Sequence, residues 1–335
     1  MADGGGIKRA LKRSLARVLH PLERLVDRIR ARKPTNPVIE GYLGYATLDG
    51  IVMRGRVLNA RKGLTSTATD SKWRNLRAML RLFLTDELSG VTVQSGSYTA
   101  VTDEEGYFTL ILPHDGAHGW HEAEALLADF PDTRCTLSAL VPPPDASFGV
   151  ISDIDDTVLE TGAYTLAKNL WTSLTGNVLT RHVYPDAKIL LDRLHDGKNP
   201  VYFVSSSPWN MFGFLQQVFQ RHGVLRAPMF LRDLGLSEDQ FITGTHGRHK
   251  GTAIDQIFAA NPTLRFVLIG DTGQEDAHVY LAAHQRHPGR VCQVILREPG
   301  PGPDTDSLAA IDAMKKAGLD VQTGRGFNAI TAPMF

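Results

Sequence analysis

Three carboxylates stand within four residues at the end of a short apolar run. Asp153, Asp155 and Asp156 follow the run 148–152 and precede Thr157. Carboxylates this close together repel one another unless a cation neutralises them. Mg²⁺ suits this set, because the ligands are hard oxygens and neither histidine nor cysteine is nearby in the sequence. An acidic turn without a metal is the alternative that this short motif leaves open.

Three later segments carry groups that suit phosphate chemistry. A run of three serines, 205–207, follows the apolar run 201–204, and its hydroxyls suit the oxygens of a phosphoryl group. Lys250 is expected to open a helix, where its ammonium and the helix N-terminus would both favour an anion. Asp271 and Asp276 follow another apolar run and add carboxylates. Acid, hydroxyl, lysine and acid thus occur in four separate segments.

These groups need a scaffold that brings the four segments together. From residue 147 onward, short apolar runs alternate with helical patterns. Strands are predicted at 148–152, 200–204, 229–231, 265–269 and 291–296, and helices near 186–195, 209–222, 251–260, 275–286 and 305–317. This repetition predicts an α/β fold with a doubly wound, Rossmann-like parallel sheet. Ligands of such sheets lie at the carboxyl ends of the strands, so all four groups are expected at one rim.

The order of the motifs resembles the haloacid dehalogenase (HAD) superfamily of aspartyl phosphatases. The segments are most similar to the catalytic domain of the actin-patch-protein-type phosphatidate phosphatases. The matching segments are 153–158 (DIDDTV), 205–210 (SSSPWN), 249–250 (HK) and 269–276 (IGDTGQED), with Tyr280 beyond. The resemblance covers residues 145–300 and does not extend clearly to the rest of the chain.

The resemblance implies a mechanism and a metal. Asp153 would attack phosphorus and form an aspartyl-phosphate, and Asp155 would protonate the leaving alcohol and then activate water. Asp153, the backbone carbonyl of Asp155 and Asp271 would bind Mg²⁺. Asp276 or Glu275 would reach the metal through water or orient the lysine.

The resemblance also implies a phosphate-binding pair. Ser205 and Lys250 would hold the phosphoryl oxygens while charge develops in the transition state. The serine run allows a slip of one residue, so Ser206 is the alternative to Ser205. We expect structural roles for three neighbours: Trp209 in the core, Asp156 as a supporting or capping carboxylate, and Thr157 as a cap of the turn.

The spacing of the motifs bears on the substrate. The intervals between Thr157, the serines and Lys250 are mostly needed for the helices of the sheet, which leaves too few residues for a large cap domain. An open site admits a phosphate that stays attached to a membrane. The apolar segment 164–174 follows the nucleophile and would lie on acyl chains or pack on its own sheet. Phosphatidate is the substrate that the resemblance implies, and a soluble phosphomonoester is the alternative.

The N-terminal segment 7–33 predicts a basic amphipathic helix. Apolar residues recur at helical spacing from Ile7 to Ile29, with arginine and lysine on the other faces. Residues 1–33 contain ten Lys or Arg and three Asp or Glu. Such a helix suits an anionic membrane surface, whereas docking on its own protein or a partner is the alternative. The alternative outside the enzymes is a membrane-tethered interaction protein with a vestigial phosphatase site.

The whole chain has 335 residues, 42% hydrophobic and 21% charged, with 36 basic and 36 acidic side chains. These values indicate a globular chain long enough for two cores. We expect the N-terminal helix in 1–35, a small β-rich domain in 36–145 and the HAD-like domain in 146–335. Outside the first helix the chain is acidic, which disfavours nucleic acid as a partner. The two cysteines are too few for a disulfide framework. We expect a cytoplasmic protein that associates peripherally with a membrane through its N-terminal helix.

Overall fold

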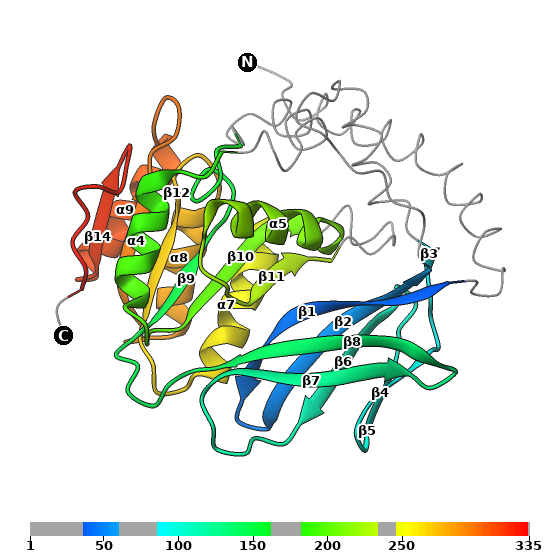
Figure 1. Cartoon of the computed structure of the whole chain (residues 1–335). Helices are drawn as coiled ribbons and strands as arrows, with labels where there is room; N and C mark the ends of the chain where they lie inside the picture. The colour runs from blue at the N-terminus through cyan, green and yellow to red at the C-terminus, as the bar shows by residue number, and fades with distance from the viewer. Residues whose placement is uncertain (1–35, 60–85, 162–181, 234–245, 334–335) are drawn as a thin grey trace, which may run out of the picture.

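The computed structural model describes residues 36–59, 86–161, 182–233 and 246–333 (Figure 1). The predicted N-terminal helix at 7–33 and the apolar segment 164–174 lie outside the described residues. The described residues contain two β-sheets. Within these ranges, none of the helices combines the length and the hydropathy needed to cross a membrane.

The C-terminal sheet, here called sheet B, is parallel throughout. Its strands are β9 (Gly149–Ser152), β10 (Val201–Pro208), β11 (Met229–Arg232), β12 (Phe266–Asp271), β13 (Val291–Arg297) and β14 (Asp320–Gly324). The first five agree with the predicted strands to within a few residues. The sequence reading missed β14, whose partly exposed residues form no apolar run. The α/β prediction and the parallel sheet are confirmed.

The helices between these strands also lie where the sequence indicates. They are α4 (Pro185–His195), the 3₁₀ turn η1 (Trp209–Met211), α5 (Phe212–His222), α7 (His246–Ala260), α8 (Asp276–Arg286) and α9 (Thr305–Lys316). Local signals account for their ends: the Asp304 side chain accepts from Ser307 N at 2.8 Å, and Gly223 closes α5 with φ 64°. The predicted start of α7 is wrong, because this helix begins at His246 and Lys250 is its fifth residue.

Alternating residues of sheet B face two separate cores. Val150, Phe203 and Val267 pack with α4 and α5, whereas Ile151 and Tyr202 pack on the other face with α7, α8 and α9. Both faces are therefore covered by helices, which explains why the strands are continuous apolar runs. Figure 1 shows the resulting three layers.

The strand order of sheet B is β11-β10-β9-β12-β13-β14. The chain first extends the sheet from β9 toward β11 and then returns to the other side of β9 with β12. The order therefore reverses between β9 and β12. In open parallel sheets, such a reversal opens a crevice at the carboxyl ends of the two strands, and ligands bind there. Asp153 follows β9 and Asp271 ends β12, so both lie at this point.

The described strands between residues 37 and 141 form a second sheet, here called sheet A. Its strands are β1 (Pro37–Thr47), β2 (Gly50–Asn59), β3 (Asp86–Glu87), β4 (Thr92–Ser95), β5 (Tyr98–Val101), β6 (Tyr107–Leu112), β7 (Gly119–Leu127) and β8 (Phe130–Val141). All pairs are antiparallel except β1 with β8. The sheet has a core of its own, which includes Met53, Leu127 and Leu137. The β-rich character predicted for this region is confirmed.

Sheet A packs against the helices and strands of the sheet B region. Tyr42 and Leu43 of β1 belong to the core that α4 and α5 share with sheet B. The Arg226 guanidinium lies 4.2 Å from the ring centre of Trp120 on β7. Figure 1 shows β1 and β2 running alongside β11 and α7. The two sheets therefore share an apolar and aromatic interface.

Candidate active site

Asp153 lies at the carboxyl end of β9, in the middle of sheet B. Its backbone N–H donates to Ile269 O of β12 at 2.8 Å, which holds this residue between the two central strands. The side chain is 1% exposed. Neither carboxylate oxygen has a well-directed hydrogen bond from the described residues. A buried carboxylate normally has such partners, so the Asp153 carboxylate has acceptor capacity for a bound group.

Lys250 reaches the same point from α7. Its Nζ lies 2.7 Å from Asp153 Oδ1 and 2.5 Å from Asp276 Oδ1, and all three side chains are buried. Burial by itself would lower the pKa of Lys250. The carboxylates of Asp153, Asp276 and Asp271 outweigh the burial, so the pKa lies above its ordinary value. Lys250 is therefore a fixed cation in the second turn of its helix, not a residue at a helix N-terminus.

Asp271 and Asp276 complete the acidic side of the cluster. Asp271 Oδ1 accepts from Gly273 N at 2.6 Å, and Asp276 Oδ2 accepts from Asp271 N at 3.1 Å. Burial raises the pKa of Asp271 and of Asp153 well above the ordinary value; neighbouring carboxylates add to the rise and Lys250 offsets part of it. One lysine thus does not neutralise the three buried carboxylates.

A divalent cation fits this donor set. Asp153, Asp271 and Asp276 each offer a carboxylate oxygen, and these oxygens lie within 4.8 Å of one another. The set is all oxygen and buried, and Asp153 has unpaired acceptor capacity. Mg²⁺ binds through a few carboxylates of this kind. Three of the four predicted metal-site residues therefore come together through their carboxylates.

The fourth, Asp155, faces the serines rather than the other carboxylates. Its Oδ2 accepts from Ser205 Oγ at 2.9 Å and from Ser207 Oγ at 3.0 Å. Ser205 Oγ also accepts from Ser207 N at 2.9 Å. The Ser206 hydroxyl is buried with no hydrogen-bond partner among the described residues. Ser205 is thus placed beside the second acid of the motif, and the structure assigns Ser207 a contact that the sequence reading did not single out.

Gln274 is a further group that sequence reasoning passed over. Its Nε2 donates to Asp271 Oδ2 at 3.1 Å and to the backbone carbonyl of Asp155 at 3.3 Å. One amide therefore joins the loops that follow β9 and β12. The only signal was its place between acidic residues in 269–276, which does not reveal a contact with a segment more than a hundred residues earlier.

The turn after Asp155 is built by Asp156. This residue has φ 55°, a left-handed conformation that costs free energy in any residue except glycine. Its Oδ1 accepts from Thr161 N at 2.9 Å and from Thr161 Oγ1 at 3.0 Å, so the supporting role is observed. The capping role predicted for Thr157 is wrong, because its buried hydroxyl has no partner among the described residues.

Arg297 holds this turn from β13, a role that no pattern in the sequence indicated. Its Nε donates to Thr157 O at 3.3 Å and its Nη2 pairs with Asp186 Oδ1 at 2.9 Å. The rings of Tyr184 and Phe327 lie 4.0 and 4.1 Å from the guanidinium carbon. A buried cation, stacked on both sides, therefore connects the nucleophile turn to α4 and to the C-terminal segment.

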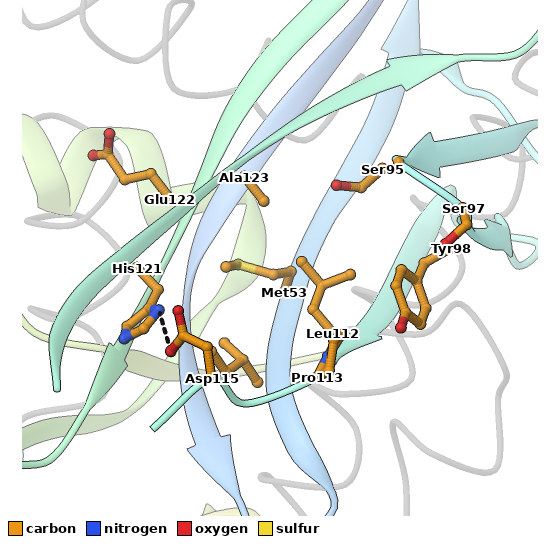
Figure 2. A pocket seen from close by; sticks show the side chains of 12 residues that line it. Met53, Ser95, Ser97, Tyr98, Leu112, Pro113, Asp115, His121, Glu122 and Ala123 are labelled. Carbon is orange, nitrogen blue, oxygen red and sulfur yellow. Dashed lines mark ion pairs between the residues drawn. The ribbon is translucent and has the colours of Figure 1, made fainter. Parts of the chain in front are cut away.

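A cavity lies elsewhere, in sheet A (Figure 2). It measures about 440 Å³, with Ile51, Met53 and Leu112 among its apolar lining. Asp115 and His121 face each other at its edge, 3.9 Å apart. No residue of sheet B lines it. The cavity is thus separate from the carboxylate cluster, which is the candidate active site.

Comparisons with known proteins agree with this location. Residues 148–298 match the family described as "Phosphatidate phosphatase APP1, catalytic domain". The chain is 26% identical over 150 residues to Phosphatidate phosphatase APP1 of Saccharomyces cerevisiae, covering 44% of this chain and 25% of the yeast protein. It is 22% identical over 228 residues to an uncharacterized protein of Schizosaccharomyces pombe, covering 66% of this chain and 37% of that protein.

The match is confined to part of these relatives, since the chain spans 25% and 37% of their lengths. Among solved structures, a dehalogenase aligns with 54% of this chain and 94% of its own at 15% identity and a TM-score of 0.30. That score is too low to support an argument about fold. The motifs, the geometry and the match over one segment agree, and the resemblance is confirmed: residues 148–298 match the phosphatidate phosphatase APP1 catalytic-domain family.

Proposed function

We propose that the chain is a Mg²⁺-dependent phosphatase of the HAD type, which hydrolyses a phosphomonoester through an aspartyl-phosphate. The observation that carries the proposal is the state of Asp153. Its carboxylate is buried; Oδ1 lies 2.7 Å from Lys250 Nζ, and Oδ2 has no hydrogen-bond or ion-pair partner among the described residues. A nucleophile needs such free lone pairs.

In the first proposed step, an Asp153 oxygen attacks phosphorus and the bond from phosphorus to the leaving alcohol oxygen breaks. Asp155 gives its proton to that oxygen, so the product leaves as a neutral alcohol. Ser205 and Lys250 hold the phosphoryl oxygens, with Ser206 as the alternative to Ser205. Lys250 suits this role because it carries a permanent charge in a buried site, where its attraction for developing negative charge is strong.

In the second step, the aspartyl-phosphate is hydrolysed. Asp155, now ionised, takes a proton from water, and the water oxygen forms a bond to phosphorus as the bond to Asp153 breaks. Inorganic phosphate leaves and both side chains return to their starting state. Ser205 and Ser207 both donate to Asp155 Oδ2, which holds this carboxyl group in one position for both proton transfers.

Asp153, the backbone carbonyl of Asp155 and Asp271 would hold Mg²⁺, with Asp276 nearby. When bound, the ion would supply positive charge that offsets the carboxylates and the phosphate. Gln274 supports this arrangement, because its amide ties the Asp155 carbonyl to Asp271. Asp276 orients Lys250 through their 2.5 Å contact, which favours that role over metal binding.

For the substrate, we propose phosphatidate, converted to diacylglycerol and phosphate at a membrane surface. The family description and the yeast relative both carry the name phosphatidate phosphatase. The basic segment 7–33 and the apolar segment 164–174 suit an anionic lipid surface by composition. With this goes the proposed division into an N-terminal helix (1–35), a β-rich domain (36–145) and a HAD-like domain without a large cap (146–335).

The test is a panel of phosphate-release assays with and without Mg²⁺. Phosphatidate in mixed micelles is compared with soluble phosphomonoesters and phosphopeptides, and Asp153→Asn serves as the blank. We expect Mg²⁺-dependent release that is fastest with phosphatidate and absent in the blank. Near-normal turnover by Asp153→Asn would overturn the mechanism. A preference for a soluble member would reject the lipid substrate, and no release at all would favour an interaction protein with a vestigial site.

A further inference from the structure

Arg54 is a partly buried cation that reaches from sheet A to the elements around sheet B. It lies on β2, and its Nη2 donates to the backbone carbonyl of Met229 on β11 at 2.7 Å. Its guanidinium carbon lies 4.7 Å from the ring centre of Phe230 and 4.8 Å from that of Trp209. One side chain of sheet A thus contacts two residues of β11 and the first residue of η1.

The charge of Arg54 is stabilised by a backbone carbonyl and aromatic rings. No ion pair among the described residues involves this arginine, and its Nε is buried without an acceptor there. Burial lowers its pKa to about 10, so it remains charged at neutral pH. An apolar side chain would fill the same space without the cost of burying a charge. What the guanidinium adds is direction, since it stacks on rings and donates to one carbonyl at the same time.

Trp209, the ring under Arg54, is held by a second residue of sheet A. The Tyr42 ring is stacked on it at 4.5 Å between centres and 21° between planes. Tyr42 is also in edge contact with Phe212 at 4.7 Å, and it is 2% exposed. Trp209 therefore has its position set by two side chains from sheet A.

The position of Trp209 matters because of what precedes it in the chain. Residues 205–208 form the end of β10, and Trp209 follows them directly. Ser205 and Ser207 in this segment hold Asp155. Met229, the acceptor of the Arg54 hydrogen bond, pairs with Phe203 of β10. Arg54 thus contacts both the residue after the serine segment and the strand beside it.

We propose that Arg54, with Tyr42, is a positioning residue for the phosphate-binding end of β10, so that the β-rich sheet takes part in catalysis by fixing Ser205, Ser207 and, through them, Asp155. This inference rests on the proposed phosphatase function. It assigns sheet A a role in the reaction, which the catalytic-domain match over residues 148–298 leaves outside.

The test compares two arginines of the same strand. Arg56 on β2 is buried, but its hydrogen bonds go to Glu87 and to the carbonyl of Glu105, both in the sheet A region. Arg54→Met and Arg56→Met are made in the full chain, and kcat/KM is measured for a soluble phosphomonoester well below each melting temperature. We expect a loss of about 10- to 100-fold for Arg54→Met, the usual scale for misplaced catalytic groups, and no more than about twofold for Arg56→Met.

A binding measurement separates positioning from a lower folded fraction. Titration with orthovanadate, a phosphate analogue, gives both a stoichiometry and a dissociation constant, and the constant does not depend on how much protein is folded. We expect Arg54→Met to weaken vanadate binding about tenfold, whereas Arg54→Lys, which keeps the charge, recovers part of the loss. If Arg54→Met does not fold, the pair Arg54→Lys and Arg56→Lys carries the same comparison.

Equal kcat/KM and equal vanadate affinity in the Arg54 and Arg56 variants would overturn the positioning role. Failure of the proposed function itself looks different, because the wild-type chain would then release no phosphate from any member of the panel.

Discussion

The two sheets bury charge in different places. At the carboxyl ends of sheet B, Asp153, Asp271, Asp276 and Lys250 are each no more than 3% exposed. The core of sheet A is formed by apolar side chains. Arg54, which is partly buried, and Arg56, which is buried, alternate along β2 with residues of that core.

This difference reflects two requirements: sheet A needs a stable core, whereas sheet B also needs a reactive site. Buried like charges cost free energy, and a fold that needs only to be stable avoids them. Sheet A follows that rule. Sheet B breaks it at the point where the strand order reverses, where a parallel sheet offers a ligand site. Changes in the carboxylate cluster of sheet B and in the apolar core of sheet A should therefore have opposite patterns of effect on activity and stability.

The largest expected effect is the loss of activity in Asp271→Asn. This change removes one carboxylate from the metal-binding set, and the loss of metal charge stabilisation is expected to lower kcat/KM about a thousandfold. It also removes one of the crowded buried charges, so the metal-free protein should melt at a higher temperature than the wild type. Addition of Mg²⁺ should raise the melting temperature of the wild type and leave that of the variant unchanged.

The matched control for this prediction is Asp255→Asn in α7. Asp255 is only partly buried and pairs with Arg286 and His287, each at 2.8 Å, rather than with a residue of the cluster. It should retain activity within about twofold and keep the Mg²⁺ response, as surface substitutions usually do. A metal-free Asp271→Asn that melts below the wild type would contradict the view that sheet B sacrifices stability at this point.

The next effect concerns a charge in sheet B that supports structure. Arg297→Met leaves the Asp186 carboxylate without its 2.9 Å partner and is expected to destabilise the fold by about 3–5 kcal/mol, measured by denaturant unfolding. The double variant Arg297→Met, Asp186→Asn should recover part of that loss. Additive losses in the double variant would show that the two side chains do not act as a pair.

A smaller effect is expected in the core of sheet A. Leu127 is fully buried there, and Leu127→Ala should cost about 2–4 kcal/mol through the cavity it leaves. Because it contacts neither the strand ends of sheet B nor their supports, kcat/KM of the folded fraction should stay within about twofold. Ile111→Ala, at a residue that is 50% exposed on the same sheet, is the control and should change stability by less than about 1 kcal/mol. A large fall in kcat/KM for Leu127→Ala would remove the contrast between the sheets.

The smallest effect is a pH dependence at the edge of sheet A. Burial, and after it the neighbouring Asp233, raises the pKa of Glu105 to about 7; Arg56 acts in the opposite direction and Asp103 in the same one. A raised pKa means that the native state binds the proton more tightly. The stability contributed by Glu105 is therefore present below about pH 4.5 and is lost as the pH rises toward 7.

Glu105→Gln should remove this loss. Thermal melts at pH 5 and pH 8 are expected to show a smaller fall in melting temperature for the variant than for the wild type. Asp129→Asn, on an exposed turn of the same sheet region, serves as the control and should follow the wild type. Parallel pH profiles for Glu105→Gln and the wild type would rule out the coupling of Glu105 with Asp233.

The sequence was most informative where the signal is local. The apolar runs and helical patterns placed five strands of sheet B and its helices within a few residues, because burial on both faces leaves an uninterrupted apolar run. It failed at the start of α7, where residues 246–249 contain Gly, Arg and His and show no apolar periodicity. It also failed at β14, a partly exposed edge strand, for the same reason.

The motif residues were found from the sequence, but several of their partners were not. Asp153, Asp155, Lys250 and Asp271 follow from residue types at strand ends and from a family resemblance. Gln274, Arg297 and Arg54 act on segments 100 or more residues away, as the contact of Gln274 with Asp155, 119 residues earlier, illustrates. Nothing in the local composition encodes such a partner, since polar side chains at these positions look like ordinary surface residues.

The sequence by itself determined the α/β class, the strand ends that carry the carboxylates and the residue types of a phosphoryl-transfer site. Only the tertiary structure decided that Asp155 contacts Ser205 and Ser207, that Asp276 holds Lys250, and that Arg54 of sheet A lies on Trp209. The physical reason is that periodicity and motif spacing express which residues are buried along one element. Which elements become neighbours depends on sheet order and on packing between the two sheets, and these arise only when the whole chain folds.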